Sequence, residues 1–149
     1  MEIRISKMNL SHLDEVMRIE EESFPDPWSR GSFQREISEN TYAYYFVAEL
    51  EGKVLAYIGA WIVTDELHIT NLAIKKEYRK MGLAQKLIDY IVGFSVEEEC
   101  KRATLEVRVS NLPAIKLYEK KGFVAVGTRP KYYSNDNEDA LIMWKIIGI

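Results

Sequence analysis

The chain has 149 residues, of which 47% are hydrophobic and 29% are charged. This is enough apolar material for one sizeable core, and we expect a single α/β domain over residues 1–149. The 20 Lys and Arg residues are outnumbered by 23 Asp and Glu residues. The resulting net charge of −3 argues against a nucleic-acid binder that relies on a broad basic surface.

The sequence gives no signal for export, membrane insertion or a metal site. Its longest apolar run, residues 54–63, contains Gly59 and is too short to span a bilayer as a helix. The N-terminal residues lack the basic start and long apolar segment of a signal peptide. With Cys100 as the only cysteine and two isolated histidines, neither a disulfide framework nor a structural zinc site is expected. We therefore expect a cytoplasmic protein without a metal ion.

The first part of the chain is predicted to form a strand and two helices. Residues 2–6 form a short strand, followed by a helix with Ser11 as its N-cap and Asp14 three residues later. The proline-rich residues 24–28 end that helix. Ser29 is then expected to cap a second, short helix that runs to about Ser38.

The middle of the chain is rich in predicted strands. Residues 42–49 and 53–64 have strand character, and Glu51-Gly52 between them is typical of a hairpin turn. Residues 66–74 continue this meander as a third strand.

The remaining elements alternate between helix and strand. A helix is predicted over residues 82–98, followed by a strand over residues 102–109, which should pair in parallel with residues 66–74 across a right-handed crossover. Pro113 suits the first turn of a helix that Gly122 ends. The chain closes with strands over residues 123–131 and 139–147.

The segment between the third strand and the long helix predicts an anion site. It reads Arg79-Lys80-Met81-Gly82-Leu83-Ala84. A helix N-terminus presents free backbone N–H groups and the positive end of the helix dipole, and Gly82 lets a phosphate approach closely. Arg79 and Lys80 add positive charge. The alternative is a solvated basic loop, which is common at helix starts.

These residues resemble the GCN5-related N-acetyltransferases. Arg79-x-x-Gly82-x-Ala84 is similar to the Q/R-x-x-G-x-G/A loop that holds the pyrophosphate of acetyl-CoA in that family. The resemblance is closest to the RimI-type ribosomal-protein-alanine N-acetyltransferases and covers nearly the whole chain. Further matching segments follow in the family's order: Leu105-Glu106-Val107-Arg108, Ser110-Asn111, Ala114 and Leu117-Tyr118-x-x-x-Gly122-Phe123.

The resemblance implies a fold and an acetyl-CoA site. The fold is a mixed, mostly antiparallel sheet with flanking helices and a central, splayed parallel pair of strands. Acetyl-CoA is then expected to lie in the slot between residues 66–74 and 102–109. Backbone groups of the first strand would pair with its pantetheine arm. The implied cofactor-binding residues are Leu72, Ala73, Ile74, Arg79, Lys80, Met81, Gly82, Leu83, Ala84 and Asn111. For Asn111 the alternative is a residue that supports a turn.

Glu106 and Tyr118 are the catalytic residues that the resemblance implies. Glu106 would accept the proton of the acceptor amine, directly or through water, and Tyr118 would protonate the departing CoA thiolate. Alternation along its strand places Glu106 on the same face as Arg108, so the other interpretation of Glu106 is an ion pair with Arg108. For Tyr118 the alternative is a core aromatic residue with its hydroxyl at the edge.

Trp28 and Tyr133 are the candidate contacts to the acceptor. Both lie in segments that the family uses near its protein substrate, although each could equally be an aromatic residue that anchors a surface loop. The acidic run Glu20-Glu21-Glu22 would favour a basic peptide, with a solvated helix face as its alternative.

The sequence therefore predicts an acetyltransferase that modifies the N-terminal α-amine of a protein. The resemblance implies the N-terminal alanine of ribosomal small-subunit protein eighteen as the acceptor. Direct transfer to the amine is expected, since Cys100 follows three glutamates that disfavour a thiolate. We expect a monomer that binds no nucleic acid and no membrane. Two alternatives stay open: a small amine or lysine side chain as acceptor, and a non-catalytic acyl-CoA-binding module.

Overall fold

The computed structural model describes residues 2–148, which form a seven-stranded sheet with helices on both faces. The strands are β1 (Arg4–Lys7), β2 (Ala43–Leu50), β3 (Lys53–Val63), β4 (Glu66–Ile74), β5 (Arg102–Arg108), β6 (Val124–Arg129) and β7 (Ala140–Ile146). The helices are α1 (Leu13–Ser23), α2 (Arg30–Ser38), α3 (Leu83–Glu97) and α4 (Leu112–Lys120), with short 3₁₀ turns at Leu10–His12 and Lys76–Tyr78. Each predicted strand and helix is present, with ends shifted by one or two residues.

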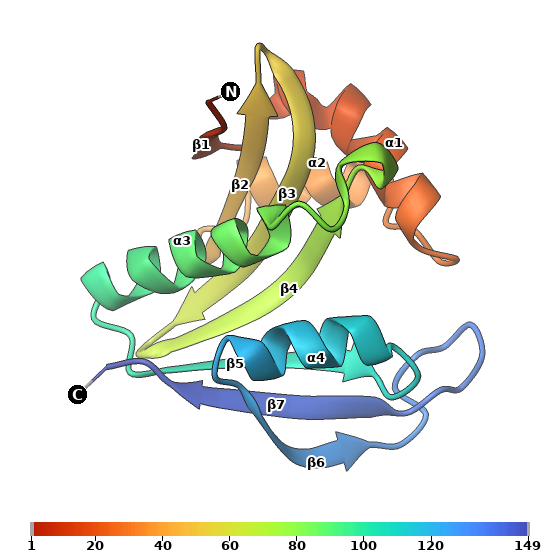
Figure 1. Ribbon diagram of the computed structural model, residues 1–149, viewed down its shortest axis with the longest axis vertical. Helices are drawn as coiled ribbons and strands as arrows, with labels where there is room; N and C mark the ends of the chain where they lie inside the picture. Colours follow the sequence, from red (N-terminus) through yellow and green to blue (C-terminus); the bar gives the residue numbers. More distant parts are fainter. Residues whose placement is uncertain (1, 149) are drawn as a thin grey trace.

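The sheet has the order β1-β2-β3-β4-β5-β7-β6, and every neighbouring pair except one is antiparallel. The exception is the parallel pair of β4 and β5, because α3 returns the chain to the end of the sheet at which β4 begins before β5 starts. This confirms the predicted βαβ unit and the mostly antiparallel sheet. Figure 1 shows β1–β4 in one half of the sheet and β5–β7 in the other, with the two halves touching near the start of β4 and β5.

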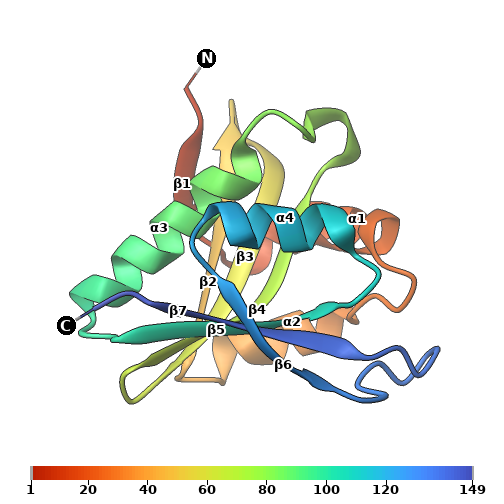
Figure 2. The ribbon, with the colours of Figure 1, turned by 60° about the horizontal axis from the view of Figure 1, so that its bottom comes forward.

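The two faces of the sheet carry separate hydrophobic clusters. Leu87 and Ile91 of α3 pack with the inward residues of the central strands, and Tyr118 of α4 joins the same cluster. On the opposite face, Val16 of α1 and Phe33 of α2 pack against β2 and β3. Figure 2 shows α3 and α4 on one side of the sheet and α1 and α2 behind it. Strand β4 contributes to both clusters, with Leu67 and Ile69 in the first and Ala73 in the second.

Local capping agrees with the sequence at α2 and differs at α1. The Ser29 side chain accepts a hydrogen bond from the Ser32 N–H, as predicted for an N-cap. The prediction that Ser11 caps the first helix is wrong. The Asn9 side chain accepts from the Ser11 N–H, and His12 Nδ1 accepts from the Asn9 N–H at 3.0 Å. This reciprocal pair starts a 3₁₀ turn that leads into α1.

The two predicted turns have the backbone conformations that such turns require. Glu51 and Gly52 both have positive φ, as a tight hairpin turn with the right-handed twist of the strands requires. Gly122 follows α4 with φ of +94°, in the left-handed region expected after a helix. Among the helices of residues 2–148, none is both long and apolar enough to cross a membrane.

Candidate active site

Strands β4 and β5 separate halfway along their length. Their parallel pairing runs from Glu66 opposite Arg102 to Ile69 opposite Leu105 and goes no further. The register of β3 against β4 shifts at the point where the pairing ends, between Gly59 and Ala60 of β3. Such a bulge bends a strand and increases its twist. The end of β4 therefore turns away from β5, which confirms the splayed pair and leaves an open end between the two half-sheets (Figure 1).

The N-terminus of α3 has the backbone geometry that an anion site requires. Gly82 occupies the N-cap with φ of +82°, and no side chain of residues 2–148 caps the first turn. The first amides of a helix point along its axis, so they are available to a phosphate. A cavity of about 240 Å³ opens at this point. Its lining contains six of the predicted cofactor residues: Ile74, Arg79, Lys80, Gly82, Leu83 and Ala84.

The other predicted cofactor residues lie outside this cavity. Ala73 is buried in the cluster beneath α1 and α2, while Leu72 packs toward α3, so the two side chains fill the core on opposite faces. Met81 is exposed beside the helix N-terminus. Asn111 caps α4 through a hydrogen bond from the Ala114 N–H at 3.3 Å, as the turn-supporting alternative expected.

Hydrogen bonds to β4 and α1 hold the Arg79 side chain in place. Its Nε donates to the Ile74 carbonyl oxygen at 3.0 Å, and Nη2 donates to Ser23 Oγ at 3.1 Å. The side chain therefore holds the loop against the end of β4 and the end of α1. Lys80, with φ of 63°, is exposed beside it.

Glu106 lies at the open end and is bound to His68, not to Arg108. His68 Nε2 lies 2.8 Å from Glu106 Oε2, and the Tyr132 hydroxyl lies 3.5 Å from Oε1. The alternative of a Glu106–Arg108 ion pair is therefore wrong. Burial by itself would raise the pKa of Glu106, but the His68 hydrogen bond and charge, Arg129 and Tyr132 lower it below its ordinary value. Glu106 is thus a carboxylate at neutral pH.

Tyr118 is a buried aromatic residue of α4. Its ring meets Phe123 in an edge-on arrangement with 5.7 Å between centroids. Burial raises the pKa of Tyr118 above its ordinary value, and the neighbouring Tyr133 raises it further. The hydroxyl therefore keeps its proton at neutral pH and can act as a donor. The core-aromatic alternative describes the ring correctly and is compatible with a role for the hydroxyl.

The turn over residues 24–28, between α1 and α2, is anchored by a buried carboxylate. Glu20 is 2% exposed, and its Oε2 accepts a hydrogen bond from the Trp28 N–H at 2.9 Å while Oε1 accepts from the Tyr57 hydroxyl. Burial raises the pKa of Glu20. The Trp28 ring packs on Phe33 at 5.4 Å. Glu20 is therefore not part of a solvated acidic face, which corrects that interpretation of Glu20-Glu21-Glu22.

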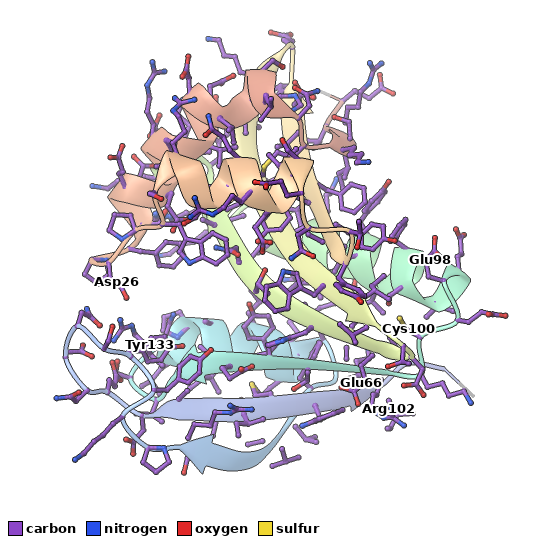
Figure 3. The ribbon with its side chains drawn as sticks, turned by 180° about the vertical axis from the view of Figure 1, so that it is seen from behind. Asp26, Glu66, Glu98, Cys100, Arg102 and Tyr133 are labelled. Carbon is purple, nitrogen blue, oxygen red and sulfur yellow. The ribbon has the colours of Figure 1, made fainter. Side chains whose placement is uncertain are left out.

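Tyr133 belongs to the β6–β7 loop on the other side of the open end. Its ring lies under the Arg108 guanidinium, 4.0 Å from centroid to Cζ. Figure 3 shows Asp26 and Tyr133 on opposite sides of the gap between the half-sheets, with Glu66 and Arg102 at the end where the strands meet. The structure thus places Trp28 and Tyr133 in the two segments that border the open end.

Sequence reasoning missed His68, Tyr132 and the contacts of Arg108. His68 lies opposite Thr104 in the parallel register, two residues from Glu106 along β5. A register for β4 and β5 would have placed His68 beside Glu106, but the sequence alone does not supply one. Tyr132 is adjacent to the predicted Tyr133, but only the path of the β6–β7 loop brings its hydroxyl to Glu106.

The fold and this site define a class of protein. The model of the Acetyltransferase (GNAT) family matches residues 13–123. The chain therefore belongs to the GNAT acetyltransferases.

Individual relatives are similar over nearly the full chain. A Bacillus subtilis (strain 168) protein, provisionally named a ribosomal protein bS18-alanine N-acetyltransferase, is 46% identical over 97% of this chain and 95% of its own length. An Escherichia coli (strain K12) ribosomal protein bS18-alanine N-acetyltransferase is 30% identical over 93% of this chain and 94% of its own length. The crystal structure of the Escherichia coli ribosomal-protein-S18-alanine N-acetyltransferase superimposes with a TM-score of 0.90, covering 99% of this chain and 96% of that one at 30% identity.

Proposed function

We propose that this enzyme transfers the acetyl group of acetyl-CoA to the α-amine of a protein N-terminus, and that its acceptor is the N-terminal alanine of ribosomal small-subunit protein eighteen. The names of the Bacillus and Escherichia coli relatives support this acceptor. One observation carries the chemistry: an ionised carboxylate, Glu106, held by His68 at 2.8 Å where two parallel strands separate.

The residues around α3 fit the binding of acetyl-CoA. Gly82 leaves open space where a Cβ would stand among the described residues, so phosphate oxygens can reach the first amides of α3. The exposed Lys80 supplies a positive charge beside them, and Arg79 holds the loop in shape. The end of β4, which lacks a partner in β5, has backbone groups free to pair with an extended ligand arm. When bound, acetyl-CoA supplies the thioester whose carbonyl the amine attacks.

Glu106 is proposed to accept the amine proton. A protein α-amine has a pKa of about 7.7–8.0, so it is largely an ammonium ion at neutral pH and must lose a proton before it can attack. Because Glu106 is already ionised, it attracts this ammonium ion and takes the proton directly or through one water. His68 orients the carboxylate by donating from Nε2.

Tyr118 is proposed to donate a proton to the departing thiolate. The hydroxyl is protonated at neutral pH because burial raises its pKa. A thiolate with a pKa of about 8.5 leaves more easily when a donor is within hydrogen-bond reach. Cys100 is a poor covalent carrier by comparison, since burial and then Asp65 and Glu98 raise the pKa of its thiol. These properties support direct transfer to the amine.

The acceptor is proposed to enter between residues 24–28 and 132–138, with Trp28 and Tyr133 on either side. Residues 132–138 reach Glu106 through the Tyr132 hydroxyl, and Arg108 joins these residues to Asp26 of the other segment. A ribosomal acceptor and a single buried cysteine support a cytoplasmic enzyme, and we propose that it acts as a monomer without nucleic acid or membrane.

Mass spectrometry after incubation with acetyl-CoA and two peptides tests the proposal. One peptide begins with the free N-terminal alanine of the ribosomal protein, and the other is identical but blocked at its N-terminus with internal lysines retained. We expect one acetyl group on the first peptide alone. Acetylation of lysines in both peptides would overturn the acceptor. If neither peptide nor any member of a panel of small amines is acetylated, the proposal of an enzyme is overturned in favour of a non-catalytic acyl-CoA-binding module.

A further inference from the structure

Arg108, the last residue of β5, collects polar groups from two segments that are far apart in the sequence. Its side chain is 17% exposed. From the β6–β7 loop, Nη1 donates to both Asp136 carboxylate oxygens at 2.9 Å and to Glu138 at 3.2 Å, and Nη2 donates to Asn135 at 2.8 Å. From the α1–α2 turn, Asp26 accepts from Nη2 at 3.4 and 3.5 Å.

The guanidinium is suited to this position because it is planar and carries donors on several sides. One face covers the Tyr133 ring at 4.0 Å, and the edges meet three carboxylates. Lysine could provide the charge but not this set of simultaneous contacts.

No backbone ladder joins the two half-sheets at this end, because the pairing of β4 with β5 stops at Ile69 and Leu105. The segments that border the opening are therefore joined through side chains. Asp26 faces Tyr133 across the gap in Figure 3, and Arg108 contacts both.

We propose that Arg108 is a positioning residue for the acceptor: it joins residues 24–28 to residues 132–138 and so sets the distance between the two segments that receive the peptide. This inference rests on the proposed function. Without the guanidinium, Asp26 loses its contact with the β6–β7 loop, and the like charges of Asp26, Asp136 and Glu138 favour separation of the two segments. The α3 N-terminus does not take part in these contacts, so the binding of acetyl-CoA is expected to be unaffected.

Strand β5 offers a matched control in Arg102. It lies on the same face as Arg108, six residues earlier, and its Nη1 pairs with Asp65 at 3.0 Å and Glu66 at 3.3 Å. These contacts are at the closed end, where backbone hydrogen bonds already join β4 to β5. Arg102→Gln therefore removes the same charge from the same strand without opening the acceptor segments.

Steady-state kinetics with the alanine peptide tests the inference in wild type, Arg108→Gln, Arg108→Lys and Arg102→Gln. We expect Arg108→Gln to raise the KM for the peptide about tenfold, with kcat changed by less than about threefold and the KM for acetyl-CoA unchanged. Arg108→Lys should recover part of the loss, and Arg102→Gln should behave as wild type. An unchanged peptide KM in Arg108→Gln, or an equal rise in Arg102→Gln, would overturn the inference.

Hydrogen exchange read by mass spectrometry tests the joining itself without turnover. Arg108→Gln should increase exchange in residues 24–28 and in residues 132–138, whereas Arg102→Gln should leave both unchanged. Faster exchange in residues 132–138 alone would overturn the inference, because Arg108 would then hold only the β6–β7 loop.

A second variant tests the same contact if Arg108→Gln does not fold. Asp26→Asn on the exposed turn must then produce the same rise in peptide KM, and an unchanged peptide KM counts against the joining of the two segments. A wild-type enzyme that acetylates neither peptide would refute the proposed function, while the exchange result would still decide the role of Arg108.

Discussion

The two ends of the β4–β5 pair contain similar charged side chains but differ in backbone pairing, which is present at one end and absent at the other. At the closed end, Arg102 binds Asp65 and Glu66 beside strands that their backbones already hold together. At the open end, Glu106 binds His68 and Arg108 binds Asp26, and the strands have no backbone contact there. Strand β5 is therefore joined to β4 by backbone hydrogen bonds over its first half, and its second half contacts other segments through side chains.

The comparison shows how an open sheet can carry a buried charge. Burial removes most of the hydration of the Glu106 carboxylate, and the hydrogen bond from His68 of the neighbouring strand replaces part of it. The side-chain partner on β4 allows an ionised carboxylate at the point where the two strands separate.

The largest expected effect comes from Glu106→Gln, which removes the base at the open end and keeps its shape. We expect kcat to fall by about 10²–10⁴, as for the loss of a general base. Binding of acetyl-CoA, measured by calorimetry, should not change, because the α3 N-terminus is intact. Full activity in this variant would exclude Glu106 from the mechanism.

Tyr118→Phe removes the candidate proton donor and keeps the ring that packs on Phe123. Turnover is expected to decrease about tenfold to a hundredfold over the whole pH range from 6 to 9. Circular dichroism and thermal unfolding provide the control that the core of α4 is retained. Rates equal to those of wild type at every pH would argue against Tyr118 as the acid.

His68→Phe removes the hydrogen bond that orients Glu106 and leaves the carboxyl group of Glu106 present. Phenylalanine keeps the edge-on packing of the His68 ring on Trp61 but not the hydrogen bond to Glu106. Without that bond the burial of Glu106 is less opposed, so its pKa rises and the carboxylate is protonated at higher pH. We expect kcat to decrease on the order of tenfold at pH 7, with the acid limb of kcat against pH shifted upward. An acid limb at the wild-type position would contradict this role.

Glu20→Gln has the smallest expected effect, which is on the free energy of unfolding alone. Glu20 lies in α1 and binds the turn that borders the open end. Because burial raises the pKa of Glu20 in the folded state, the folded protein retains the proton at pH values where the unfolded chain, with a glutamate pKa of about 4.3, has lost it. The wild-type free energy of unfolding therefore falls as the pH rises through this window, and glutamine removes that part of the decrease. Urea unfolding of both proteins between pH 4 and pH 7 measures it. Parallel curves would show that the folded state does not hold this proton.

The sequence by itself determined the elements and several site positions. Strand alternation placed Glu106 on the face opposite Leu105 and Val107, and the glycine before the amphipathic helix marked the candidate anion site, because both depend on periods of two and 3.6 residues that are local to the chain. Ser29 was identifiable as a cap for the same reason, while Asn9 and Ser11 are both competent caps and the choice between them depended on His12.

Only the tertiary structure decided which side chains meet. The alternative interpretation of Glu106 was an ion pair with Arg108 on its own strand, but the register of β4 against β5 brought His68 to Glu106, and Arg108 binds Asp26 and the β6–β7 loop. Glu20 became a buried anchor because Tyr57 and the Trp28 N–H converge on it from a strand and a turn. Partners of this kind come from segments distant in the sequence. Their pairing follows from strand register and loop path, which periodicity does not encode.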